Sequence, residues 1–182
     1  MKIKSVCVFC GSRVPRNESF IELAARCGEV IGELGLTLVY GGGGTGLMGV
    51  VSKAANERGA EVVGIYPRFL HEREPLSRHV SEAFIVDSMF ERKKIMIERS
   101  DAFIILPGGV GTLDEIFEII TLKTLEMLDK PLIFINKDGY WDTLNDMLRH
   151  IADNNLVSSH VFDSYRFVPT VEEAFIKLGF KL

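Results

Sequence analysis

Apolar residues fall into two alternating kinds of segment along this chain. Short runs rich in Val, Ile, Leu and Phe alternate with longer segments of helical period, which is typical of repeated β-α units. The run Phe103-Ile104-Ile105-Leu106 shows no polar alternation, so we expect strands that are buried on both faces, as in a parallel sheet covered by helices. We predict strands at 3–9, 36–40, 61–65, 82–86, 102–106, 131–136 and 165–168, and helices at 18–34, 46–58, 88–99, 112–127, 141–153 and 170–179.

These elements predict an α/β fold, with a doubly wound, mostly parallel sheet of the Rossmann-like kind. The 182 residues contain no internal repeat and no Pro/Gly/Ser linker long enough to divide them. We therefore expect one domain spanning 1–182. The longest connection without a clear period is 67–81, and such loops often line binding sites.

Composition and charge narrow the classes of function. The chain is 47% apolar and 25% charged, close to the average of soluble globular proteins. A formal charge of −4 argues against a nucleic-acid partner. We find neither a membrane-spanning apolar stretch nor the pattern of a signal peptide, and we expect a cytoplasmic location. A small-molecule ligand fits these features better than a polymer or a membrane.

The cysteines and histidines do not indicate redox or metal chemistry. Cys7 and Cys10 form a C-x-x-C pair, but Cys7 falls inside the apolar run 6–9, whereas thioredoxin-like pairs open a helix after their strand. The four histidines show no metal-ligand spacing. We expect no structural metal and no cofactor.

Two glycine-rich turns follow predicted strands, at the edge where open α/β sheets bind ligands. The first, Gly41 to Gly49, satisfies G-x-G-x-x-G in two registers, a weak sign of dinucleotide binding. The strand that follows ends in Tyr66-Pro67-Arg68, without the acidic residue that would hold a ribose, and Val50 excludes a Walker-type phosphate loop. Two interpretations stay open for this turn, a tight packing turn and a ligand contact.

The second turn is Pro107-Gly108-Gly109-Val110-Gly111-Thr112. Its glycines allow backbone N–H groups to point at an anion, and we expect Thr112 to open a helix whose amino end favours a phosphate. The run Thr112-Leu113-Asp114-Glu115 also matches a capping box, in which Glu115 would only bond the start of its own helix. The residue types alone leave both roles open.

The helix predicted before this turn carries a basic pair on an apolar face. Residues 89, 92, 93 and 96 share one side of that helix, so Arg92 and Lys93 lie between Met89 and Met96, which we expect to face the sheet. If that helix starts beside the carboxyl end of the adjacent strand, Arg92 can reach a phosphate or a ribosyl oxygen at the second turn. This arrangement favours a site for a nucleoside 5′-monophosphate.

The segment 107–115 reads P-G-G-x-G-T-x-x-E, and Met89-x-x-Arg92-Lys93 precedes it. In this combination the chain resembles the LONELY GUY family, which comprises cytokinin riboside 5′-monophosphate phosphoribohydrolases. Further blocks in the family's order cover nearly the whole chain: Cys10-Gly11-Ser12, Gly41 to Gly49, Ser100 to Phe103, Asp129 to Pro131 and Asp138 to Tyr140. Members are often labelled lysine decarboxylases, but no lysine here has a recognisable pyridoxal-phosphate setting.

The resemblance implies hydrolysis of the N-glycosidic bond of a nucleoside 5′-monophosphate, giving a free base and ribose 5-phosphate. It implies that Glu115 stabilises an oxocarbenium-like ribose and orients water, and that Arg92 stabilises the departing base or the ribosyl oxygens. Gly108, Gly109, Gly111 and Thr112 would hold the phosphate. The other substrate contacts that it implies are Ser12, Gly43, Gly44, Glu74, Met89, Lys93 and Thr121.

The resemblance also implies a homodimer with sites near its interface. Plant members carry Thr-Trp where this chain has Thr121-Leu122, and they differ again at 42–45, which leaves open whether AMP or an N6-modified AMP is preferred.

The alternative from another class is a non-catalytic nucleotide or molybdenum-cofactor carrier on the same fold. A third hypothesis, a dinucleotide-dependent oxidoreductase, is supported only by the doubled G-x-G-x-x-G pattern of the first turn. A carrier needs phosphate contacts but no carboxylate near C1′, so Arg92 together with Glu115 favours the enzyme.

Overall fold

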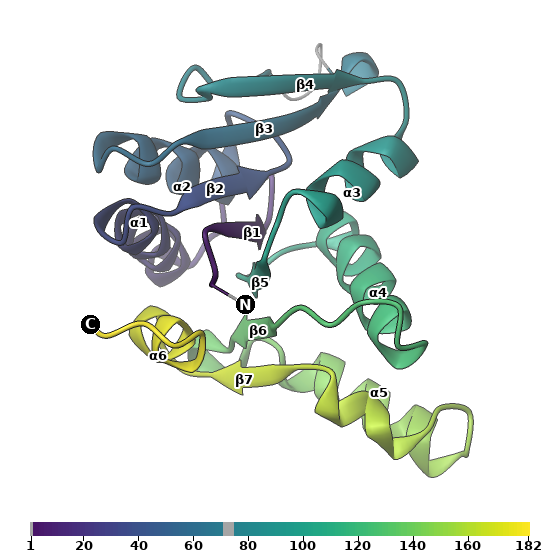
Figure 1. Ribbon diagram of the computed structural model, residues 1–182. Helices are drawn as coiled ribbons and strands as arrows, with labels where there is room; N and C mark the ends of the chain where they lie inside the picture. The colour runs from purple at the N-terminus through teal and green to yellow at the C-terminus, as the bar shows by residue number, and fades with distance from the viewer. Residues whose placement is uncertain (1, 71–74) are drawn as a thin grey trace.

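The computed structural model describes residues 2–70 and 75–182 and arranges them around one seven-stranded sheet (Figure 1). The strand order is β4-β3-β2-β1-β5-β6-β7, and every neighbouring pair is parallel. The strands are β1 Ser5–Phe9, β2 Thr37–Tyr40, β3 Val62–Pro67, β4 Glu82–Val86, β5 Ala102–Ile105, β6 Leu132–Ile135 and β7 Arg166–Val168. The helices are α1 Glu18–Glu33, α2 Gly46–Glu57, α3 Met89–Glu98, α4 Val110–Thr124, α5 Asp142–Asp153 and α6 Val171–Lys177.

The predicted fold class is confirmed, with strands and helices in the expected order and places. The largest change in a boundary is in α4, which runs from Val110 to Thr124 where we predicted 112–127. The sheet is buried on both faces, since helices α1, α2 and α6 cover one face and α3, α4 and α5 cover the other (Figure 1). Successive residues of β1 alternate between these two cores, with Val6 and Val8 in one and Cys7 and Phe9 in the other.

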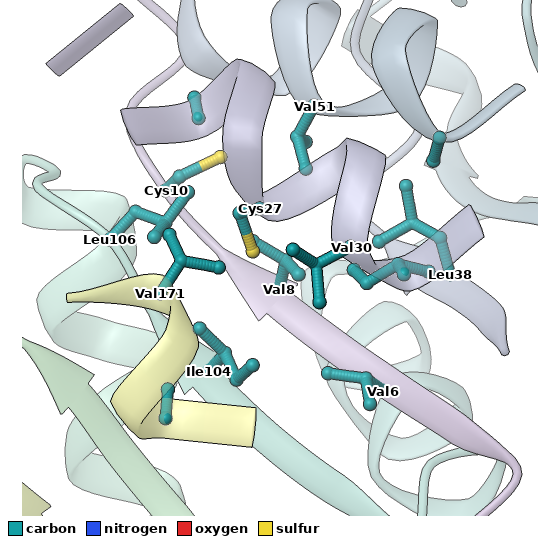
Figure 2. Packing of buried hydrophobic residues seen from close by; sticks show 14 of the residues in the cluster. Val6, Val8, Cys10, Cys27, Val30, Leu38, Val51, Ile104, Leu106 and Val171 are labelled. Atoms are coloured by element: carbon teal, nitrogen blue, oxygen red, sulfur yellow. The ribbon is translucent and has the colours of Figure 1, made fainter. Parts of the chain in front are cut away.

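All three cysteines are free thiols inside these cores. Figure 2 shows Cys10 and Cys27 among the apolar side chains on the α1 side of the sheet. Burial raises the pKa of Cys27 to about 12. Burial, followed by the negative charge of Glu115, raises the pKa values of Cys7 and Cys10 well above 9.0. These thiols therefore stay protonated at neutral pH, and Cys7 lies within a strand as predicted.

The chain changes direction along the sheet between β1 and β5. From β1 it proceeds outward to β2, β3 and β4, then returns through α3 to place β5 on the other side of β1. The segments after these two strands meet, since the Gly11 N–H donates to the Pro107 carbonyl at 3.0 Å. Such a switch point is where open α/β sheets bind ligands. Among the described residues, no helix is both long and apolar enough to cross a membrane.

Candidate functional site

Arg92 is buried against β3 and the segment that directly follows β2. It lies on α3, whose N-cap residue is Ser88, and the Ser88 hydroxyl accepts a hydrogen bond from the Glu91 N–H at 3.1 Å. The Arg92 side chain donates from Nε to the Ile65 carbonyl at 3.2 Å and from Nη2 to the Gly41 carbonyl at 2.8 Å. Only 6% of Arg92 is exposed. Main-chain carbonyls of β3 and of the first glycine turn therefore fix the direction of a permanent positive charge.

The first glycine of the first turn makes room for this arginine. A Cβ atom on Gly41 would overlap the Arg92 guanidinium. Sequence reasoning missed this role, because it considered the turn only as a packing or a ligand-binding loop. The position of Gly41 immediately after β2 was the available signal.

Glu115 faces the core, and the capping-box interpretation of it is wrong. Helix α4 begins at Val110 with Gly109 as its N-cap residue and no side-chain cap, so Thr112 is the third helical residue. A Thr-x-x-Glu spacing inside a helix cannot act as the box, because the box requires Thr at the N-cap. Glu115 is 8% exposed, and its charge raises the pKa values of Cys7 and Cys10.

The charges of Glu115 and Arg92 act on the same two thiols, in β1 and directly after it. Each influences the pKa values of Cys7 and Cys10, which Glu115 raises and Arg92 lowers. The two side chains come from different helices, α4 and α3, which cover the same face of the sheet. The structure therefore places the two residues predicted to be catalytic on the same face of the sheet, on two helices that the ion pairs of Lys93 with Asp114 and Glu118 join.

The second glycine turn leaves open space at the start of α4. Gly109 and Gly111 are exposed, and a Cβ atom added to either would meet nothing within 4 Å. The first i to i−4 bond of the helix runs from the Leu113 N–H to the Gly109 carbonyl at 3.0 Å. The N–H groups of the first turn of a helix have no partner within it, and together with the helix dipole they suit an anion.

Gly108 and Thr112 close the inner side of this turn. Thr112 is buried, and a Cβ atom on Gly108 would overlap its side chain. The Gly108 carbonyl accepts a hydrogen bond from the Tyr140 hydroxyl at 2.6 Å. Sequence reasoning gave Tyr140 no role, although its block was among those that carried the family resemblance.

Lys93 connects α3 to α4. Its ammonium lies 2.7 Å from a Glu118 carboxylate oxygen and 3.0 Å from one of Asp114. Burial by itself lowers the pKa of Lys93, but the hydrogen bonds to Glu118 and Asp114 outweigh it and raise the pKa above its ordinary value of 10.5. The spacing of four residues, which puts both carboxylates on one face of α4, was a signal for this contact. Met89 is half-buried, with its sulfur 3.8 Å from Arg92 Nη1.

The residues predicted from the first turn lie against two other segments. The Ser12 carbonyl accepts from the Thr45 hydroxyl at 3.0 Å, and the Gly44 N–H donates to the Pro75 carbonyl at 2.8 Å. Gly43 pairs with Leu76 in an isolated bridge. A hollow of about 430 Å³ opens between α2 and residues 75–79, and neither Arg92 nor Glu115 lines it. Substrate contacts at Ser12, Gly43 and Gly44 stay predictions.

Two further substrate contacts were predicted, at Thr121 and Glu74. Thr121 is exposed on α4. It follows Glu115 by six residues, a rotation of about 240° at 3.6 residues per turn, so the two side chains do not share a face of the helix. Glu74 lies outside the described residues.

Comparison with known proteins places the chain in a family. Residues 48–178 match the model of a family described as "Possible lysine decarboxylase". Cytokinin riboside 5′-monophosphate phosphoribohydrolase LOG3 of Arabidopsis thaliana is 39% identical over 177 residues, which are 97% of this chain and 82% of that protein. The cytokinin riboside 5′-monophosphate phosphoribohydrolase of Mycobacterium tuberculosis is 41% identical over 170 residues, which are 93% of this chain and 90% of that one.

Solved structures share the fold. The molybdenum cofactor carrier protein of Chlamydomonas reinhardtii has a TM-score of 0.74 at 18% identity, covering 97% of this chain and 96% of its own. The molybdenum cofactor binding protein of Rippkaea orientalis has a TM-score of 0.71 at 21% identity, covering 98% and 97%. At these identities the likeness supports the fold alone. The resemblance predicted from the sequence motifs is confirmed by the family match and by relatives of about 40% identity, and the chain belongs to the LONELY GUY (LOG) family.

Proposed function

We propose that this chain is a nucleoside 5′-monophosphate phosphoribohydrolase, acting on AMP or on a cytokinin riboside 5′-monophosphate as a single domain spanning 1–182. One observation carries the proposal: Arg92 and Glu115 are buried on two linked helices that cover the same face of the sheet, and the helix that bears Glu115 begins at an open glycine turn. Relatives of 39% and 41% identity that cover nearly the whole chain bear the name of this activity.

The second turn suits the 5′-phosphate. The N–H groups at the start of α4 point along the helix axis into the open space beside Gly109 and Gly111. The Thr112 hydroxyl adds a donor on the inner side of the turn. A phosphate held here anchors the nucleotide, and the binding energy of this remote group then serves the reacting ribose.

Glu115 and Arg92 suit the two charges that develop in the reaction. When the bond between C1′ and the base breaks, positive charge develops on the ribose and negative charge on the base. The Glu115 carboxylate stabilises the ribose cation and orients the attacking water. Arg92 stabilises the base or the ribosyl oxygens, and its bonds to the Ile65 and Gly41 carbonyls hold it ready in that direction.

The residues do not fit the family's description as a lysine decarboxylase. A lysine that forms a Schiff base with pyridoxal phosphate must lose its proton, which is favoured by a lowered pKa. The lysine beside the candidate site is Lys93, and Glu118 and Asp114 raise its pKa. No observation specific to this chain favours the carrier alternative.

A homodimer is part of this proposal. The exposed apolar residues on α3 and around α4 include Phe90 at 80% exposure, Val110 at 84%, Leu125 at 62% and Met127 at 70%, and these support an interface there. Thr121 precedes Leu125 by four residues, so the two share a face of α4, and a Thr121 contact with nucleotide fits a site shared between two copies. The cytoplasmic location stays a prediction.

The test is release of free base from AMP and from N6-isopentenyladenosine 5′-monophosphate, followed by chromatography. We expect activity on at least one substrate, and a fall in kcat of about 10²–10⁴-fold in Glu115→Gln. Glu22→Gln, at an exposed glutamate of α1, is the matched control and should keep full activity. Folded protein that binds either nucleotide without releasing base would support a carrier instead, and equal rates from wild type and Glu115→Gln would remove Glu115 from the mechanism.

A further inference from the structure

The two carbonyl groups at the entrance to the second turn are both held by donors from other segments. The Pro107 carbonyl accepts the Gly11 N–H at 3.0 Å, and the Gly108 carbonyl accepts the Tyr140 hydroxyl at 2.6 Å. Tyr140 comes from the connection between β6 and α5, 32 residues away in sequence. These bonds attach a glycine-rich turn, which has little side-chain packing of its own, to two rigid neighbours.

The Tyr140 bond fixes the direction of a backbone donor. In a planar trans peptide, the carbonyl of one residue and the N–H of the next point in opposite directions. Holding the Gly108 carbonyl toward Tyr140 therefore aims the Gly109 N–H to the opposite side. Thr112 packs against the Gly108 side of this peptide, but a Cβ atom on Gly109 would meet nothing within 4 Å, so the Gly109 side is open.

The Tyr140 ring is itself held in place. It packs edge-on against Phe20 of α1, at 5.2 Å between ring centroids, and against Trp141, at 4.9 Å. The chain reaches Tyr140 through Asp138 and Gly139, which both have positive φ. The hydroxyl is thus presented by a built turn and two ring contacts, which limits the entropy lost in holding the bond.

The Asn136 side chain completes this turn. Its amide oxygen accepts the Trp141 N–H at 2.7 Å, and its amide nitrogen donates to Asp142 at 2.7 Å. Asn136 therefore closes the connection on either side of Tyr140. The position of the Tyr140 hydroxyl follows from backbone and side-chain bonds that do not involve the second turn.

We propose that Tyr140 is a positioning residue for recognition of the 5′-phosphate. It holds the Gly108–Gly109 peptide so that the Gly109 N–H points into the phosphate site, and it thereby favours nucleoside 5′-monophosphates over nucleosides. This inference rests on the proposed function, in which the second turn binds the phosphate. Tyr140 acts through the backbone of the turn and has no part in the bond cleavage.

Tyr140→Phe tests this role, because it removes the hydroxyl and keeps the ring. We expect KM for AMP and the Kd of ribose 5-phosphate to rise about fivefold to tenfold, the effect of one hydrogen bond, with kcat nearly unchanged. Hydrolysis of adenosine, which has no phosphate, should keep the wild-type kcat/KM. A merely structural role would change AMP and adenosine alike.

Tyr165→Phe is the matched control, because the Tyr165 hydroxyl bonds Asn145 at 3.4 Å, on the α5 side of β7. This variant should leave the KM for AMP and the Kd of ribose 5-phosphate unchanged. An unchanged Kd for ribose 5-phosphate in Tyr140→Phe, or equal losses with AMP and adenosine, would overturn the inference. Failure of this inference and failure of the proposed function give different results. If the proposed function is wrong, the folded wild type releases no base from AMP. Binding of ribose 5-phosphate to wild type and to Tyr140→Phe can still be compared in that case, and it tests the role of Tyr140.

Discussion

The two glycine-rich turns of this protein have similar composition and opposite surroundings. In the first turn, a Cβ atom on Gly41 would overlap Arg92, one on Gly46 would overlap the Ser12 backbone, and one on Gly49 would overlap the Gly44 carbonyl. In the second turn, the same atom on Gly109 or Gly111 would meet nothing within 4 Å. Protein atoms fill the space beside these glycines of the first turn and beside Gly108 of the second, whereas the space beside Gly109 and Gly111 is open.

This contrast explains why the doubled G-x-G-x-x-G pattern is misleading. In a dinucleotide site the second glycine lets the backbone approach a pyrophosphate. Here Gly46 has a positive φ of 57° and lies against Ser12, while the Gly44 N–H is already bonded to Pro75. Gly41, Gly46 and Gly49 serve close packing, one of the two interpretations that the sequence left open, and the ligand contacts of Gly43 and Gly44 stay predictions.

Helix α3 joins the two turns through consecutive residues. Arg92 bonds the Gly41 carbonyl in the first turn, and Lys93 bonds Asp114 and Glu118 on the helix that follows the second. Arg92 and Lys93 are neighbours on α3, and Asp114 is the neighbour of Glu115 on α4. The Lys93 contacts therefore join α3 to α4, the two helices that carry Arg92 and Glu115.

The largest expected effect comes from Gly41→Ala, which adds a methyl group in the first turn where the Arg92 side chain lies. Its methyl group displaces the Arg92 guanidinium from the Gly41 and Ile65 carbonyls. We expect kcat for base release to fall by about 10²–10³-fold, as for loss of one transition-state donor. Because the effect acts through Arg92, the double variant with Arg92→Ala should be no slower than Arg92→Ala alone. A wild-type kcat in Gly41→Ala would show that Arg92 need not be held there.

The next effect is on stability, at Gly46. Gly46→Ala combines a strained positive φ with overlap of the Ser12 backbone, and we expect it to lower the free energy of unfolding by about 2–3 kcal/mol. Gly35→Ala is the matched control, because Gly35 has φ of 64° but open space around its Cα, so only the backbone strain of about 1 kcal/mol applies. Urea unfolding measures both. A loss at Gly46 no larger than that at Gly35 would contradict the packing role of the first turn.

A smaller, pH-dependent effect is expected from the link between the turns. Lys93→Met removes an ammonium held by Glu118 and Asp114, and we expect a loss of about 1–2 kcal/mol near neutral pH. The folded-state pKa of Lys93 is raised, so its contribution is fully present below its ordinary value of 10.5 and is lost as pH rises through the higher folded value. The difference in unfolding free energy between wild type and Lys93→Met should therefore stay constant from about pH 7 to 9 and shrink above about pH 10.5.

Lys94→Met serves as the control for this prediction. The Lys94 side chain is 72% exposed and lies 3.9 Å from Glu98 on the surface, so its replacement should change stability little at any pH. Equal effects of Lys93→Met and Lys94→Met would mean that the contact between α3 and α4 does not depend on this ion pair.

The order of strands and helices could be predicted because hydrophobic period and turn residues are local properties. The predicted start of α4 is two residues late, because the sequence rules place Val110 and Gly111 before the helix, whereas Gly109 is the N-cap residue and Gly111 lies in the first helical turn. Burial of Arg92 and Glu115 on the same face of the sheet follows from packing between distant segments. Spacing suggested their proximity, but it did not reveal that carbonyls hold Arg92.

The contacts of Lys93 and Tyr140 show more clearly what could not be predicted from the sequence. Each depends on which face of one helix or loop meets another, and this is set by the sheet order. The family resemblance predicted a substrate contact for Lys93, while the structure shows its ammonium between two carboxylates of α4. A role in holding α4 and a contact with substrate are compatible, because a lysine has three donors.

Gly111→Ala tests the central claim, that the open glycines of the second turn leave room for a phosphate, most directly. Gly111 has no positive φ and lies in the first turn of α4, so alanine should leave the unfolding free energy unchanged or raise it by up to about 1 kcal/mol. Titration calorimetry with AMP should nevertheless show affinity about tenfold weaker or worse, because the methyl group occupies space that the phosphate needs. A stable Gly111→Ala protein that binds AMP as tightly as wild type would contradict the account.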